Sequence, residues 1–107
     1  MLIINSPTPG KRIQVFPNHF EEQMDWHNAE KSCNELEKGW RLPTKDELKL
    51  MYEQLHRKGI GNFKASLYWS GSESGKEQAW YFVFGSGGAI NKRNKTVVCN
   101  VRPVRSL

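Results

Sequence analysis

The chain has 107 residues, of which 37% are hydrophobic, and its aromatic residues comprise four Trp, three Tyr and five Phe. This length predicts one domain, residues 1–107, with one modest core in which aromatic side chains supply much of the buried area. No apolar run approaches the roughly 20 residues that cross a bilayer, and Met1–Ile4 lacks the basic residues that begin a signal peptide. We therefore expect no membrane insertion.

The formal net charge of +5 is concentrated in the second half of the chain. Residues 1–60 hold nine Lys or Arg and nine Asp or Glu, whereas residues 61–107 hold seven and two. Lys92, Arg93 and Lys95 form the densest basic group. Such a group either attracts an anionic partner or is a solvated surface that keeps the protein soluble. Nucleic acid is the least favoured partner, because no aromatic side chains are interleaved with this group to stack on bases.

The first elements predicted in chain order are two short strands and a helix. The strands, Leu2–Ile4 and Ile13–Phe16, flank a turn-rich segment at residues 5–10. A helix is predicted over residues 25–38, where Asp25 is placed to cap its start and Gly39 to end it in a left-handed conformation. Its apolar residues recur at intervals of three, four and three, as on one helical face: Trp26, Ala29, Cys33 and Leu36.

The segment that follows Gly39 is the strongest fold signal in the chain. Two apolar residues alternate with an arginine in an extended stretch, and a proline then discourages helix at the residue before it. A threonine and a glutamate three residues later form a capping box, which satisfies free backbone N–H groups and predicts a second helix over residues 45–58. The residues concerned are Trp40, Arg41, Leu42, Pro43, Thr44 and Glu47.

The second half of the chain predicts a sheet. Residues 80–84 are apolar on both alternating faces, which is typical of a central strand covered on both sides. Gly85–Gly88 is predicted to turn this strand into a hairpin, and Pro103 to place the last strand at an edge or to end its pairing near Arg102. The predicted strands are Tyr68–Ser70, Ala79–Phe84, Ala89–Asn91 and Thr96–Arg102.

No residue pattern indicates catalysis, a metal site or a cofactor. His19, His27 and His56 are scattered without metal-ligand spacing, and most carboxylates lie on predicted helix surfaces. We therefore expect no catalytic residue, metal or cofactor, and no enzyme activity. Cys33 and Cys99 either form a disulfide between the first helix and the last strand or remain two buried thiols that act as small hydrophobes.

These motifs resemble a bacterial and phage domain family typified by the C-terminal domain of a collagen-like adhesin, the Lcl C-terminal type. The resemblance covers residues 24–105 and is carried by the Gly-Trp-Arg-Leu-Pro-Thr block, Tyr68-Trp69-Ser70 and the closing Val101-Arg102-Pro103-Val104-Arg105. It implies an α+β, C-type-lectin-like fold: two helices packed on a small, twisted, mostly antiparallel sheet whose N- and C-terminal strands pair. Most matched residues would then be scaffold, with these in or near the core: Trp26, Cys33, Trp40, Leu42, Tyr68, Trp69, Trp80 and Cys99.

The resemblance also implies what the domain does. Arg41 would be a half-buried anchor that needs hydrogen-bond acceptors, and the polar segments 70–78 and 91–96 would form a binding surface. The sequence lacks the triplets with which calcium-dependent lectins hold calcium and sugar, so binding would be calcium-independent. The candidate ligand contacts are Ser70, Ser72, Glu73, Ser74, Lys76, Asn91, Lys92, Arg93, Asn94 and Lys95.

Three hypotheses for function remain open at this stage. The first is a non-enzymatic adhesion module that binds a protein or a glycan, such as an anionic one, on a cell surface. The second is a variable display protein of a diversity-generating retroelement, which has the same scaffold. Formylglycine-generating enzymes share this scaffold too, but their active site needs a much larger domain. The third is an oligomerising cap of a surface fibre. Within a longer precursor, the domain would lie at a cell surface, in secreted protein or on a phage particle.

Overall fold

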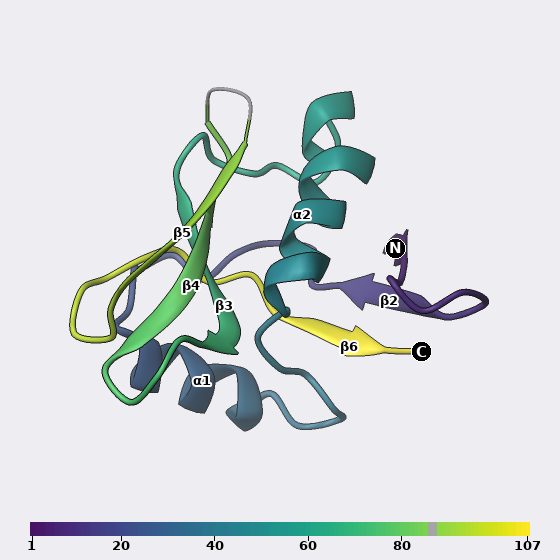
Figure 1. Cartoon of the computed structure of the whole chain (residues 1–107). Coiled ribbons are helices and arrows are strands. Elements are labelled where there is room, and N and C mark those ends of the chain that lie inside the picture. Colours follow the sequence, from purple (N-terminus) through teal and green to yellow (C-terminus); the bar gives the residue numbers. More distant parts are fainter. Residues whose placement is uncertain (86–87) are drawn as a thin grey trace.

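The computed structural model describes residues 1–85 and 88–107 and contains two three-stranded antiparallel sheets and two α-helices (Figure 1). The first sheet, in the order β1-β2-β6, joins both ends of the chain: β1 Leu2–Asn5, β2 Arg12–Val15 and β6 Val104–Ser106. The second sheet has the order β3-β4-β5: β3 Leu67–Glu73, β4 Gln78–Val83 and β5 Ala89–Asn94. The helices are α1 Trp26–Glu35 and α2 Lys45–Gln54, followed by the 3-10 turn η1 His56–Lys58. The predicted α+β class and the pairing of the two chain ends are confirmed, although the strands divide between two sheets.

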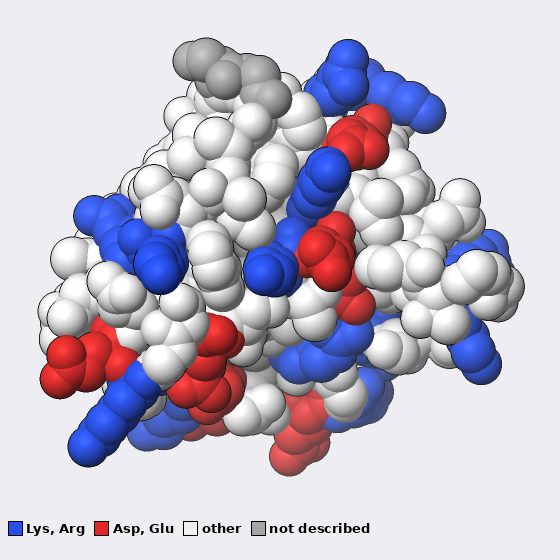
Figure 2. Space-filling model, viewed as in Figure 1, with Lys and Arg blue, Asp and Glu red and all other residues white. Residues whose placement is uncertain are grey.

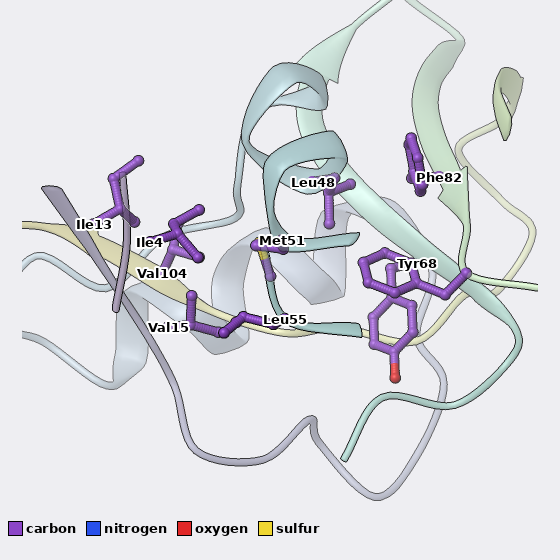
Figure 3. Packing of buried hydrophobic residues seen from close by; sticks show 10 residues of the cluster. Ile4, Ile13, Val15, Leu48, Met51, Leu55, Tyr68, Phe82 and Val104 are labelled. Atoms are coloured by element: carbon purple, nitrogen blue, oxygen red, sulfur yellow. The ribbon is translucent and has the colours of Figure 1, made fainter. Parts of the chain in front are cut away.

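Helix α2 lies between the two sheets and fills the main core (Figure 3). Its start is fixed by the predicted capping box, in which Thr44 Oγ1 accepts from Glu47 N at 3.1 Å and Glu47 Oε1 accepts from Thr44 N at 2.8 Å. Its apolar side then buries residues three and four apart against both sheets, as an amphipathic helix does. The cluster comprises Ile4, Ile13, Val15, Leu48, Met51, Leu55, Tyr68, Phe82, Phe84 and Val104.

A second core lies between α1 and the other face of the β3-β4-β5 sheet. Successive side chains of a strand point to opposite faces, and Trp69 accordingly enters this core while Tyr68 enters the first. Two buried indole N–H groups donate to backbone carbonyls, Trp26 Nε1 to Ser70 O and Trp69 Nε1 to Met24 O, both at 2.8 Å. The cluster comprises Trp26, Ala29, Cys33, Leu42, Trp69, Ala79, Cys99 and Val101.

The extended segment between the two helices lies beside β6, at the edge of the first sheet. Arg41 pairs through its backbone with Val104, with N–H···O distances of 2.8 and 2.9 Å. The Arg41 guanidinium binds both carboxylate oxygens of Glu47, at 2.7 and 3.0 Å, and Ser106 Oγ at 3.1 Å. Burial acts to raise the pKa of Glu47, but hydrogen bonds from Arg41 and Thr44 hold it below its ordinary value. Arg41 therefore has the acceptors that the sequence analysis required.

Two of the tryptophans expected in the core are only half-buried. Trp40 packs edge-on against Phe16, with ring centroids 5.0 Å apart, and under the Arg105 guanidinium at 4.9 Å. Trp80 lies on the sheet surface, where lysine side chains cover part of its ring. Both residues are wide enough to pack along one edge and remain accessible along another.

The structure also corrects several element boundaries. Helix α1 ends at Glu35, because Glu37 and Lys38 already have left-handed φ angles of 60° and 54° before Gly39. The strand predicted at Thr96–Arg102 is wrong: this segment makes isolated bridges from Cys99 and Asn100, and the last strand forms only after Pro103. Strand β5 extends to Asn94, three residues beyond its predicted end. The hairpin turn predicted at residues 85–88 lies partly outside the described residues.

Candidate functional site

The two polar segments that the sequence singled out meet beside the start of α1, where the turn after β3 lies next to the turn after β5 (Figure 1). A backbone hydrogen bond from Lys95 N to Glu77 O, 2.9 Å long, joins them. Between them is an open hollow of about 220 Å³, which we call the polar hollow. Its lining residues are His27, Lys76, Glu77, Asn94, Lys95 and Thr96.

Lys95 fixes the shape of the polar hollow. Its ammonium donates to Glu73 Oε2 at 2.6 Å and to the Lys76 carbonyl at 3.0 Å, and it lies 4.5 Å from the Trp26 ring centroid. The residue is only 5% exposed. The expectation that Lys95 offers a free charge to a ligand is therefore wrong: its side chain instead ties both turns to the start of α1.

The candidates on and after β3 are mostly occupied by internal contacts. Ser70 is fully buried, and its Oγ donates to Trp80 O at 2.7 Å, so it cannot face a ligand as predicted. Ser72 Oγ accepts from Lys45 N at 3.1 Å, and Ser74 is half-buried. Glu73 is paired with Lys95. Lys76 and Glu77 are exposed as well, and neither forms a salt bridge with a described residue.

The candidates Asn91–Asn94 belong to strand β5, so their side chains alternate between two faces of the sheet. Lys92 is exposed and lies over Trp80, with Nζ 5.6 Å from the ring centroid. Arg93 points to the opposite side, 5.5 Å from the Tyr81 ring centroid. Lys92, Arg93 and Lys95 consequently do not form the single basic patch that their proximity in sequence suggested.

His27 is the residue of the polar hollow that sequence reasoning did not place there. It is exposed and adjoins the buried Trp26, with ring centroids 5.3 Å apart in an edge-on arrangement. The signal available in the sequence was its position directly after Trp26, a predicted core residue at the start of α1. Among residues 1–85 and 88–107, no three His, Cys, Asp or Glu side chains are grouped to hold a metal ion, and no helix is long and apolar enough to cross a membrane.

The two thiols, Cys33 and Cys99, are buried in the second core and free. Burial raises the pKa of Cys33 to about 12. Burial also raises the pKa of Cys99, to about 11, against the lowering effect of Arg93, whose Nη1 lies 3.8 Å from the sulfur. Since the thiolate is the nucleophile, these cysteines act here as small apolar side chains.

A further buried polar cluster surrounds Arg102, which is completely inaccessible. Its guanidinium donates to the carbonyls of Gly61 and Asn62, at 2.8 and 3.2 Å, and stacks on Phe63 with a centroid distance of 4.1 Å. Burial lowers the Arg102 pKa to about 10. Burial, followed by the charges of Arg102 and Lys64, also lowers the pKa of His19. This cluster holds the loop after η1 in place and faces no hollow described above.

Comparisons with known proteins agree with this architecture. Residues 9–105 match the profile of the Lcl C-terminal domain. A solved structure of similar fold is EMS16, described as an antagonist of the collagen receptor integrin α2β1 (GPIa/IIa), at 16% identity, a TM-score of 0.60 and 94% coverage of each chain. A search of curated proteins finds no match. At such low identity EMS16 supports the C-type-lectin-like fold alone, whereas the profile match spans nearly the whole sequence. The chain therefore belongs to the Lcl C-terminal domain family.

Proposed function

We propose that this domain is a non-enzymatic, calcium-independent binding module of a bacterial or phage surface protein, and that a glycan contacts it at the polar hollow. The observation that carries the proposal is the convergence of two polar turns, distant in sequence, which Lys95 holds in one fixed arrangement. Rigidly held surface loops are where binding residues commonly lie. A binding role also agrees with the adhesin that typifies the family.

The chemistry of the polar hollow suits sugar hydroxyls. Its side chains offer imidazole, ammonium, carboxylate, amide and hydroxyl groups within one open depression of about 220 Å³. Sugar hydroxyls both donate and accept hydrogen bonds, so they can pair with this mixture. The carboxylate of Glu73 is already neutralised by the Lys95 ammonium at 2.6 Å, which supports binding without calcium. Exposed Lys76 and Glu77 add one charge of each sign.

A glycan array probed with the labelled domain tests this proposal, first in calcium and then in EDTA. We expect binding in both buffers. The variants His27→Ala, Lys76→Ala and Glu77→Ala should each bind at least tenfold more weakly, and these substitutions leave the side-chain contacts of Lys95 intact. Lys31→Ala, which removes an exposed lysine of α1, is the matched control and should bind like the unmodified domain. Glycan binding that disappears in EDTA, or that none of the three substitutions weakens, contradicts the proposal.

A further inference from the structure

A second surface, which shares no lining residue with the polar hollow, lies between α2 and β5; we call it the α2-β5 face. It contains a groove of about 250 Å³ whose floor includes the apolar groups of Tyr52, Phe82 and Ile90. Ile90 is 43% exposed, so much of its apolar side chain is open to contact. Charged side chains of Lys49, Glu53 and Arg57 stand at its rim.

Basic side chains dominate the α2-β5 face. Lys45 and Lys92 place their ammonium groups 4.6 and 5.6 Å from the centroid of Trp80, which links the helix side of the face to the strand side. Among the described residues the salt bridges are Arg41–Glu47 and Lys95–Glu73, so these lysines have no carboxylate within 4 Å. Figure 2 shows basic side chains over β5 and over α2, separated by an uncharged strip, with acidic side chains beside the basic ones over α2.

Two of the lysines on this face lie close to each other. Lys45 and Lys49 are four residues apart on α2, so they are neighbours on the helix surface and repel each other, and Glu53, four residues after Lys49, offsets part of this repulsion. An anionic partner would relieve this repulsion and would also replace the missing carboxylates. The charge arrangement therefore fits an acidic occupant.

Among the described residues, strand β5 pairs with β4 alone, so it is an edge strand of its sheet. The Lys95 N–H bonds to Glu77 O, so in the antiparallel alternation the backbone groups of residues 89, 91 and 93 face β4. Those of Ile90 and Lys92 therefore face outward. The Lys92 N–H donates to the neighbouring Asn91 Oδ1, at 2.8 Å, a local contact that an incoming strand can replace.

We propose that the α2-β5 face binds an extended acidic segment of a partner protein, which adds to β5 as a further strand. Directly opposite residues form the contacts across a strand pair, so an apolar side chain would lie opposite Ile90 and a carboxylate opposite Lys92. The recognised pattern is thus an apolar residue two positions from Asp or Glu. This inference goes beyond the glycan proposal and stands independently of it.

Two other occupants fit the α2-β5 face less well. A second copy of this chain pairing through β5 would bring Lys92 and Arg93 of the two copies close together, and like charges across strands are destabilising. A sulfated or carboxylated glycan would satisfy the lysines but would leave the apolar floor beneath its polar groups. A peptide supplies both an apolar side chain and carboxylates.

Selection from a phage library of random ten-residue peptides, followed by fluorescence anisotropy with a selected synthetic peptide, tests the proposal. We expect the selected peptides to be enriched in the apolar-x-acidic pattern. The variant Lys92→Glu should bind such a peptide at least tenfold more weakly. Binding by this variant should be restored when the acidic residue of the peptide is replaced by lysine. Ile90→Pro, which removes an outward N–H without touching the β4 pairing, should weaken binding at least tenfold. Ile90→Val and the surface control Lys31→Glu should not.

Several results would overturn this inference. They are the absence of an enriched pattern, peptide binding that neither Lys92→Glu nor Ile90→Pro weakens, and no restored binding of the lysine-substituted peptide by Lys92→Glu. Binding of heparin oligosaccharides that Lys92→Glu abolishes, without any peptide binding, would identify a glycan site instead. If Ile90→Pro fails to fold by circular dichroism, the charge exchange at Lys92 still decides the outcome.

Discussion

Replacing Lys95 with methionine tests whether one side chain holds the polar hollow together. Methionine keeps an unbranched apolar stem against Trp26 but removes the ammonium and its two hydrogen bonds, to Glu73 and to the Lys76 carbonyl. Hydrogen bonds to charged groups contribute about 1.5–3 kcal/mol. The Glu73 side chain is 54% exposed, so water screens the ion pair and compensates its loss. We therefore expect the free energy of unfolding to fall by about 1–2 kcal/mol.

Thermal unfolding followed by circular dichroism measures this loss, which for a domain of this size lowers the midpoint by about 5–15 °C. Lys92→Met is the matched control, because Lys92 is exposed and its ammonium only lies over the Trp80 ring. Substitutions at such a site change stability by no more than about 0.5 kcal/mol. Equal losses of unfolding free energy for the two variants, or a loss below about 0.5 kcal/mol for Lys95→Met, would refute the role of Lys95 in holding the two turns together.

Three further predictions follow from the cores and the buried polar groups. Leu48→Ala should lower the free energy of unfolding in urea by about 2–5 kcal/mol, because Leu48 is fully buried between α2 and both sheets; a loss under 1 kcal/mol would contradict this packing. His19 has a lowered pKa in the folded state, so the unfolded chain binds more protons and stability should fall as the pH drops below 6.5; His19→Gln should remove this component, whereas His27→Gln should retain it. Cys33 and Cys99 should react with a thiol reagent at neutral pH only as fast as the domain unfolds, and fast labelling in native buffer would show that the core opens locally.

Local signals in the sequence predicted the parts of the fold whose causes are local. The capping box of Thr44 and Glu47 requires only residues three positions apart, and it forms as predicted. The N-terminal strands also match, because alternation and the intervening turn residues specify them. The start of α1 at Trp26 follows from the cap by Asp25, whose Oδ1 accepts from Asn28 N at 2.9 Å.

The errors arose where distant partners decide the structure. The segment 96–102 has strand-forming residues, but its backbone bonds are divided between Met24, Leu67 and Trp69 rather than one neighbouring strand. Residues 80–84 suggested a strand buried on both faces, and β4 is indeed central, yet Trp80 remains half-buried because α2 does not cover it completely. Hydrophobicity alone does not tell which part of a strand its neighbours leave open.

Charge was the least informative signal for the binding surface, for a physical reason. Lys92 and Lys95 are three residues apart, but one lies on a strand face and the other on a turn that directs its ammonium toward Glu73. Arg102 contributes equally to the formal charge and is completely buried among carbonyl groups. A basic side chain attracts a partner only where the fold leaves its charge both exposed and unpaired. Lys49 and Lys92 on the α2-β5 face meet that condition, while Lys45 is half-buried; Lys45 and Lys49 come from the half of the chain whose formal charges cancel.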